Sequence, residues 1–311
     1  MFDFLWIIVQ VVIFIMLSPL IQGIIKKTKA LLQSRKGPGL FQGYYDLHKY
    51  FKKSLIISED ASWITKVTPY IVFGTAIFNS IWVVTFFTSR LRMEYGDILM
   101  MIYVFALARL FIALAGLDAG SSFGGMGSSR EIAISVLAEP ALFLAILSYI
   151  YKFESLSLDK ISLQFNDWTN MWFHPYVIFS FLAIMILIMT ETGRLPVDNP
   201  DTHLELTMVH EGMVLEFTGR HLALIFWGQW IKQMILLSIV VSLFFPFSSF
   251  TGGWLAILMR MMLFLLKIMG LAAVLGMIET AVAKLRFFRI PGLLKMSMIL
   301  SLLAFITQWM A

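Results

Sequence analysis

Residues 173–205 read FHPYVIFSFLAIMILIMTETGRLPVDNPDTHLE, an apolar run of membrane-spanning length that passes directly into an acidic loop. A helix needs about 20 apolar residues to cross the hydrocarbon core of a bilayer, and residues 173–191 meet that requirement. The fifteen residues 191–205 contain four carboxylates, one arginine and one histidine. Because ionisable groups near hydrocarbon are costly, a membrane protein that concentrates them usually uses them to move charge.

The composition is typical of a membrane protein. Of the 311 residues, 59% are hydrophobic and 14% are charged, and a soluble domain of this size does not need so much apolar surface. The lack of cysteine excludes disulfides, iron–sulfur ligation and a thiolate nucleophile, and the five histidines have no metal-ligand spacing. We therefore expect no metal, no cofactor and no catalytic centre in this chain. The net charge of +5 reflects the loops and does not indicate nucleic acid.

Apolar runs recur along the chain and predict an all-α polytopic fold that forms a single membrane domain over residues 1–311. The first run lacks a cationic leader and a small-residue cleavage site, so we expect a permanent span and not a signal peptide. An even number of spans places both termini on the same side. Eight spans are expected, at 4–25, 67–88, 97–117, 131–151, 173–191, 221–247, 254–283 and 292–310.

Loop charges orient this bundle. The loops after odd-numbered spans hold 15 lysines and arginines, and the other loops hold only Arg90, Arg92, Lys152 and Lys160. By the positive-inside rule, the odd-numbered loops are cytoplasmic and both termini lie outside, on the periplasmic side. The two halves of the chain show no matching broken spans, which argues against a secondary transporter. The cytoplasmic loops are then 26–66, 118–130, 192–220 and 284–291.

The first cytoplasmic loop contains the sequence RKGPGLFQGYYDLHKYFKK at residues 35–53. Gly37-Pro38-Gly39 predicts a turn. Residues 42–53 alternate aromatic and polar side chains at spacings that suit an amphipathic helix lying in the membrane interface. The alternative is a basic linker that faces lipid headgroups.

Ionisable side chains also lie inside the third and fourth spans. Glu131 and Glu139 differ by about 80° around a helix axis, so both can face one bundle interior. Pro140 removes a backbone donor and loosens the preceding turn, which could admit water beside Glu139. A buried carboxyl can hold and release protons near neutral pH, because desolvation disfavours its anion. The hypothesis is a proton relay, and the alternative is a pair with Arg109 or Arg130 that serves packing alone.

Cations interrupt the sixth and seventh spans. Lys232 lies about ten residues into its span and Lys267 lies close to the middle of the next, so both are too deep to reach water easily. Buried lysines of this kind can join proton chains, and both are therefore relay candidates. Arg260, nearer an end of its span, is better explained by snorkelling.

The acidic loop has the features of a hydrated funnel. Glu191 ends its span, glycine and proline then break the helix, and Asp198-Asn-Pro200 predicts a turn that can cap a helix. A helical stretch is expected again over 201–216. Asp201 and Glu205 are four residues apart and repel each other on a solvated face, so their clustering favours a function over a merely solvated run.

Three motifs resemble a known family. The first is Arg35 to Lys49, similar to R-x-G-P followed by Q-x-x-x-D-x-x-K. The second is Gly127-Ser-Ser-Arg130 followed by Glu139. The third is ETGRLPVD at 191–198 with the acidic residues that follow. Over essentially its whole length, the chain resembles the membrane-anchor subunit shared by respiratory complex I, where it is the H-type subunit, and by group 4 membrane-bound nickel–iron hydrogenases.

Details favour the hydrogenase branch. RKGPG at 35–39 and GLDAGSSF at 116–123 are similar to the C- and D-type membrane subunits of hydrogenase-4 and formate hydrogenlyase complexes, whereas complex I homologues typically have asparagine where this chain has Gly39. The acidic loop departs from the family through His203, which replaces a glutamate, and through about three extra residues near 207–211. These departures bear on the chemistry of the soluble partner more than on the role of this subunit.

The resemblance implies an integral membrane subunit of an oxidoreductase complex in the cell membrane of a bacterium or archaeon. Loops 26–66 and 192–220 would form the docking surface for a peripheral arm that carries iron–sulfur clusters and, in the hydrogenase branch, a nickel–iron centre. The partners would be hydrogenase-type large and small subunits, iron–sulfur subunits and antiporter-like membrane subunits. Electron transfer in the arm would be coupled to proton or Na⁺ translocation.

The candidate residues follow from the charges and motifs together. The expected relay and coupling residues are Glu131, Glu139, Glu191, Asp198, Asp201, Glu205, Glu211, Glu216, Lys232 and Lys267. The expected interface and structural residues are Arg35, Gly37, Pro38, Gln42, Asp46, Lys49, Arg109, Arg130, Arg194 and Pro196. The alternatives left open are the quinone-site H-type subunit of NADH:quinone oxidoreductase, an autonomous secondary ion transporter and a purely structural anchor.

Overall fold

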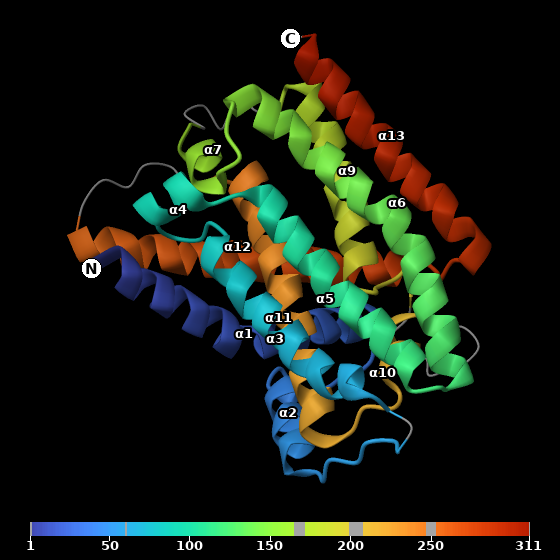
Figure 1. The fold of residues 1–311 in the computed structure, drawn as a ribbon. Coiled ribbons are helices and arrows are strands. Elements are labelled where there is room, and N and C mark those ends of the chain that lie inside the picture. Colours follow the sequence, from blue (N-terminus) through green and yellow to red (C-terminus); the bar gives the residue numbers. More distant parts are fainter. Residues whose placement is uncertain (1, 60, 165–171, 199–207, 247–252, 311) are drawn as a thin grey trace.

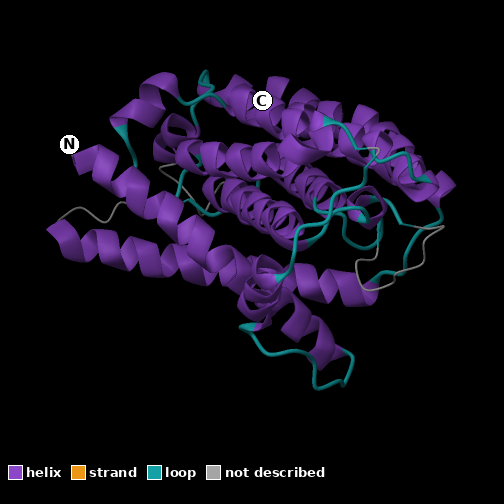
Figure 2. Ribbon diagram, turned by 60° about the horizontal axis from the view of Figure 1, so that its bottom comes forward, coloured by secondary structure: helices purple, strands orange, loops and turns teal. Residues whose placement is uncertain are grey.

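The computed structural model describes residues 2–59, 61–164, 172–198, 208–246 and 253–310. Within these ranges the chain consists of helices and connecting loops without a strand, which confirms the all-α prediction (Figure 2). The helices are α1 (Phe2–Leu32), α2 (Gln42–Lys52), α3 (Trp63–Trp82), α4 (Arg90–Tyr95), α5 (Ile98–Asp118), α6 (Ser122–Phe153), α7 (Leu158–Gln164), α9 (Pro175–Glu191), α10 (His210–Val214), α11 (Gly219–Phe244), α12 (Gly253–Ala281) and α13 (Ile290–Trp309), with a 3-10 turn at Phe287–Arg289.

Helix α11 lies at the centre of the bundle. Its most apolar 18-residue window is 67% buried within the protein, against 28–44% for the other long apolar helices. Helices α1 and α3 pack on α11, α12 packs on α1, and α13 packs on α6 and α9. The short helices α2 and α10 lie at one end of the molecule, whereas α4 and α7 lie towards the N-terminus (Figure 1). The long helices thus enclose the interior, and short helices cover its two ends.

Within the described ranges, six helices are long and apolar enough to cross a membrane, namely α1, α5, α6, α11, α12 and α13. Of the other two expected spans, α9 is apolar but only 17 residues long. Helix α3 has 20 residues, among them Lys66, Asn79 and Ser80, and does not meet the hydropathy required of a span. The multi-pass arrangement of apolar helices is therefore confirmed, while the number of eight spans and the outward termini stay predictions.

The predicted loop at 118–130 is wrong, because most of it is helical. Helix α6 begins at Ser122, where the Oγ atom of Ser121 accepts the backbone N–H of Gly124 at 3.2 Å. A serine in this position caps the helix by binding one of its free N–H groups. The second predicted motif, with Arg130, therefore lies on the same rigid helix as Glu131 and Glu139.

The predicted second span, 67–88, is also wrong at its end. Helix α3 stops at Trp82, and residues 83–89 continue as buried, irregular chain. The backbone carbonyls there bind side chains instead of helical N–H groups. Gln10 binds the carbonyls of Ser80 and Val83, and Arg92 binds those of Val83 and Phe87.

Glycines let α5 and α6 approach closely. A Cβ atom on Gly124 would lie 2.3 Å from the carbonyl oxygen of Gly116, whereas a Cβ on Gly125 would meet no atom within 4 Å. The first contact is with backbone, which cannot move aside without a shift of the whole helix. The packing of α5 on α6 thus depends on Gly124.

Replacing Gly124 with alanine is expected to destabilise the protein by about 1–3 kcal/mol, because overpacking pushes α5 away from α6. The unfolding midpoint of the detergent-solubilised protein measures this effect. Gly125→Ala is the matched control on the same helix, and it should leave the midpoint unchanged or slightly raised, since alanine favours helix over glycine. Equal midpoints for the two variants would contradict the prediction.

Candidate functional site

Arg109 on α5 lies at the centre of a buried cluster of charges. Its Nε atom is 3.4 Å from Oε1 of Glu131, and its Nη1 atom is 2.7 Å from Oε1 of Glu139. Its Nη2 atom pairs with Oε2 of Glu191 at the end of α9. One guanidinium thus connects three carboxylates from α6 and α9. The pair with Arg109 that was the packing alternative is present, but it belongs to a larger network.

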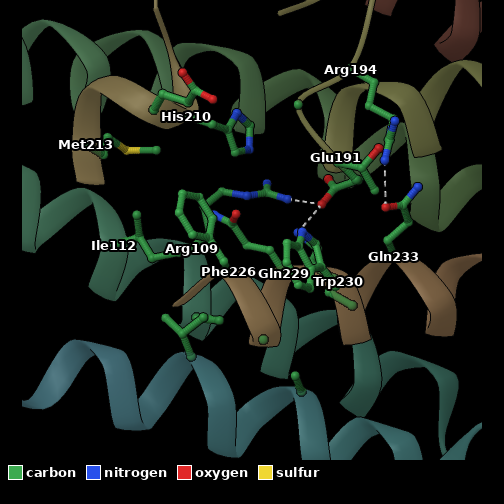
Figure 3. A pocket seen from close by; sticks show the side chains of 18 of the residues that line it. Arg109, Ile112, Glu191, Arg194, His210, Met213, Phe226, Gln229, Trp230 and Gln233 are labelled. Carbon is green, nitrogen blue, oxygen red and sulfur yellow. Dashed lines mark hydrogen bonds and ion pairs between the residues drawn. The ribbon is translucent and has the colours of Figure 1, made fainter. Parts of the chain in front are cut away.

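Lys232 extends this network to α11. Its ammonium donates to Oε2 of Glu191 at 2.8 Å, so Glu191 bridges two cations. The side chain of Glu191 is 3% exposed, and a charge at such a depth is tolerated only when it is paired and hydrogen-bonded. Helices α5, α9 and α11 therefore meet at one carboxylate, which Figure 3 shows facing Arg109.

A second cluster surrounds Arg194, two residues beyond the C-cap of α9. Its Nη1 atom donates to Oε1 of Glu279 at 2.5 Å, and its Nη2 atom donates to Gln22 and, at 2.9 Å, to Gln233. Lys29 lies 3.7 Å from the other oxygen of Glu279. Because these partners belong to α1, α11 and α12, Arg194 fastens the loop after α9 to the bundle.

Asp198 connects this loop to α10. Its Oδ1 atom accepts from the ammonium of Lys284 at 2.9 Å. Its Oδ2 atom accepts the backbone N–H groups of Val209 at 3.0 Å and of His210 at 3.3 Å. Both oxygens of this buried carboxylate are therefore used, and they hold the start of α10 in place.

A cavity of about 430 Å³ adjoins both clusters. Its polar lining includes Arg109, Glu191 and Lys232 at one end and Lys26 and Glu211 towards α1 and α10. Five buried side-chain atoms around it have no hydrogen-bond partner among the described residues: Arg109 Nε, Glu131 Oε2, Arg194 Nε, His210 Nδ1 and Gln233 Nε2. Buried polar groups are normally paired with protein or water, and water takes about 30 Å³ per molecule. The cavity is thus polar enough and large enough to hold a chain of water molecules.

The motif at residues 35–53 contributes to the lining of this cavity, and we call the part lined by α2 and α10 its mouth. A helix, α2, is present at Gln42–Lys52 as predicted, and Gln42 donates to Asp46 at 2.9 Å. Asp46 and Tyr50 both line the cavity. Burial raises the pKa of the Tyr50 hydroxyl, and the nearby carboxylates of Asp46 and Glu211 raise it further. The mouth therefore combines acidic side chains from α2 and α10.

The turn before α2 has a backbone that requires glycine. Gly37 has φ +62°, and a Cβ atom there would lie 2.3 Å from Cβ of Ala30. The adjacent Arg35 pairs with Gln33, and Lys49 on α2 is exposed. Pro38 follows the glycine. These residues shape the surface around the mouth and lie outside the charged network.

Several predicted relay residues are not brought to the Arg109 cluster. Lys267 donates to the carbonyls of Phe245 at 2.8 Å and Pro246 at 3.3 Å, at the C-terminal end of α11. That end is about 20 Å along the helix from Lys232. Glu216 is exposed beyond α10. Asp201 and Glu205 lie outside the described residues.

Two further motif residues have structural contacts. Arg130 donates to the carbonyl of Met208 at 3.0 Å, which ties α6 to the chain before α10. The carbonyl of Pro196 accepts the backbone N–H of Leu285 at 2.9 Å. Of the helical stretch expected at 201–216, the described part is helical only at His210–Val214.

Sequence reasoning missed part of the site. Gln22 and Gln233 are neutral amides inside apolar runs, and no charge pattern distinguishes them. His210 lies in the segment of about three extra residues, which was the one available signal. A separate buried pair, Arg92 with Asp159, was also missed, because both residues were placed in exposed outer loops.

Comparison with known proteins identifies the family. The NADH dehydrogenase family matches residues 5–309, so the chain belongs to it. The chain is 32% identical over 299 residues to hydrogenase-4 component C of Escherichia coli (strain K12), covering 96% of this chain and 93% of that protein. It is 29% identical to formate hydrogenlyase subunit 4 of the same strain, covering 96% and 97%. It is also 29% identical to the H-type subunit of the NADH-quinone oxidoreductase of Syntrophotalea carbinolica, covering 84% and 81%.

The fold also matches a solved structure. A chain of the membrane-bound sulfane sulfur reductase, an archaeal respiratory membrane complex, superposes with a TM-score of 0.83 over 99% of this chain and 100% of that chain. The two share 18% sequence identity, so this likeness concerns the fold. Together with the apolar helices, these relatives establish a multi-pass protein of the cell membrane that resembles the H-type subunit of complex I.

Proposed function

We propose that this chain is the integral membrane subunit of a hydrogenase-4-like or formate-hydrogenlyase-like complex, which couples electron transfer in a peripheral arm to proton translocation. The observation that carries the proposal is the line of contacts Glu139–Arg109–Glu191–Lys232 beside a polar cavity. Each side chain lies within hydrogen-bonding distance of the next, so a change of charge at one carboxylate acts on the others. Arginine keeps its proton, and protons would therefore move through the carboxylates and the water that the cavity can hold. A purely structural anchor has no need of such a cavity.

The peripheral arm would dock at the end that carries α2 and α10, on loops 26–66 and 192–220. Helix α2 exposes Tyr45, which is 69% accessible, and Phe41 beside it is 60% accessible. Exposed aromatic side chains of this kind are common at protein interfaces. The arm would hold iron–sulfur clusters and, in a hydrogenase-type complex, a nickel–iron centre. Antiporter-like subunits would extend the membrane part.

Purification of the tagged chain in mild detergent tests this function. We expect hydrogenase-type large and small subunits, iron–sulfur subunits and antiporter-like subunits to be recovered with it, together with iron and nickel. Vesicles that contain the complex should acidify or alkalinise their lumen when its redox reaction is driven, as a pH-sensitive dye reports. If Na⁺ is the coupling ion in place of the proton, ion movement in these vesicles will depend strictly on Na⁺ in the medium.

The alternatives give different outcomes in the same preparation. Recovery of quinone-dependent NADH oxidation without nickel would favour the quinone-site subunit. Ion flux through vesicles that contain this chain alone would favour an autonomous transporter. Electron transfer without any ion movement would mean that this chain is a purely structural anchor, and that result would contradict the proposal.

A further inference from the structure

His210 and Glu131 face each other through two unpaired atoms. The Nδ1 atom of His210 lies 3.5 Å from Oε2 of Glu131, and neither atom has a hydrogen-bond partner among the described residues. The side chain of Glu131 is 5% exposed and that of His210 is 20% exposed. A carboxylate oxygen and an unprotonated imidazole nitrogen are both acceptors. One proton between them therefore satisfies both atoms, and without it both stay unpaired.

The charge balance of the Arg109 cluster also favours a proton between His210 and Glu131. Two cations, Arg109 and Lys232, face the three carboxylates of Glu131, Glu139 and Glu191. Glu191 is shared by both cations, and Glu139 pairs closely with Arg109 at 2.7 Å. Glu131 has the longest contact with Arg109, 3.4 Å. The missing positive charge thus falls at Glu131, where the imidazole is its nearest uncommitted partner.

The other charged groups near this pair have their own partners. Arg130 of α6 binds the carbonyl of Met208, and Asp198 binds Lys284 and the backbone of α10. Glu211, the next residue on α10, also lines the cavity, towards Tyr50. None of these groups comes between the imidazole and the carboxylate in the described structure.

We infer that His210 and Glu131 share one proton, and that this pair is the point at which protons pass between the cavity and the Arg109 cluster. The inference rests on the proposed function. In the transfer step the imidazolium of His210 gives up one proton. The N–H bond at Nδ1 breaks and an O–H bond forms at Oε2 of Glu131, which leaves a neutral imidazole with its proton on Nε2 and no change in oxidation state. Histidine suits this step because its ring nitrogens can both donate and accept a proton. A hydronium ion in the cavity would then protonate Nδ1 again and leave a water molecule.

The loop after α9 sets the position of the imidazole. Gly193 has φ +59°, and a Cβ atom there would lie 2.9 Å from Cγ and from Nδ1 of His210. Asp198, on the same loop, binds the backbone N–H of His210 at 3.3 Å. Gly193 and Asp198 therefore set the distance between His210 and Glu131. Both residues belong to the proposed docking surface, so a partner docked there would lie next to the point of proton entry.

The test uses the assembled complex in vesicles that contain a pH-sensitive dye. In His210→Asn, the amide nitrogen stands near the position of Nδ1 and can still donate to Glu131, but it does not exchange protons. We expect this variant to assemble. We also expect it to move at least about tenfold fewer protons per electron transferred, because a general acid–base group contributes that much or more. His174→Asn, at an exposed histidine before α9, is the matched control and should behave as wild type. If His210→Asn also behaves as wild type, the inference is wrong.

An equilibrium measurement does not depend on turnover. Infrared titration of the complex should show a protonated carboxyl band that disappears in Glu131→Gln and shifts in His210→Asn. A band that persists unchanged in both variants would overturn the shared proton. A wild-type complex that transfers electrons without moving protons would overturn the proposed function instead, so the two failures are distinguishable.

Discussion

Replacing Glu191 with glutamine is expected to uncouple proton movement from electron transfer in the assembled complex. Glu191 is the single carboxylate that Arg109 and Lys232 share, and it is buried. Glutamine keeps the shape but removes the charge, so Arg109 and Lys232 lose the carboxylate that separates them. Like charges at this distance disfavour each other strongly in a medium of low dielectric constant. The ionised bridge between Arg109 on α5 and Lys232 on α11 is then lost, and with it the charge balance on which the rest of the network depends.

The measurement is the number of protons moved per electron in vesicles that contain the complex. We expect a loss of at least about tenfold, which needs a barrier increase of only about 1.4 kcal/mol. Glu94→Gln is the matched control, because Glu94 is exposed on α4 at the other end of the molecule. A Glu191→Gln complex with an unchanged proton-to-electron ratio would show that the network serves packing alone.

Replacing Arg92 with methionine is expected to cause the largest loss of stability. Arg92 is 1% exposed, and its Nε atom is 2.9 Å from Oδ2 of Asp159 on α7. Its Nη1 atom donates to Gln10 at 2.7 Å, and the guanidinium also binds the carbonyls of residues 83 and 87. Removal of one partner from such a pair leaves an uncompensated buried charge, which typically costs about 3–5 kcal/mol.

The unfolding midpoint of the solubilised protein measures this loss. Arg90→Met, two residues earlier on the exposed side of α4, removes the same charge and should shift the midpoint little. The double variant Arg92→Met with Asp159→Leu should recover part of the lost stability, because replacing a whole buried pair by apolar groups is often neutral. If the single variant is as stable as Arg90→Met, the pair of Arg92 and Asp159 does not hold α4 and α7 together.

The apolar helices were predictable because the bilayer imposes a length and a composition on every span. Glu131 and Glu139 converge on Arg109, as their helical spacing allows, since eight residues along a regular helix fix an angle. Helix α2 was one of two predictions for its segment, and its aromatic and polar side chains alternate at helical spacings, which favours the helix over an irregular linker. Local periodicity thus gives the elements and their faces.

Other features depend on contacts that no local pattern contains. The end of α3 at Trp82 is determined by Gln10, which is 73 residues from Val83 in sequence, and by Arg92 on the next helix. Lys267, like Lys232, is a lysine inside a long apolar run. It nevertheless binds carbonyls at the end of α11, because α12 passes there. His210 reaches Glu131 only because Asp198 and Gly193 hold it there. Tertiary packing determines these arrangements.

The partial exposure of Glu139 has a consequence for the whole assembly. Its carboxylate pairs with Arg109 on one side, yet 35% of the side chain stays open to the outer surface of the isolated chain, within a helix that is long and apolar enough to span a membrane. A carboxylate is costly against acyl chains. Under the proposed function, Glu139 would therefore face polar groups of an adjoining membrane subunit, and that contact would give charge a lateral exit from this chain.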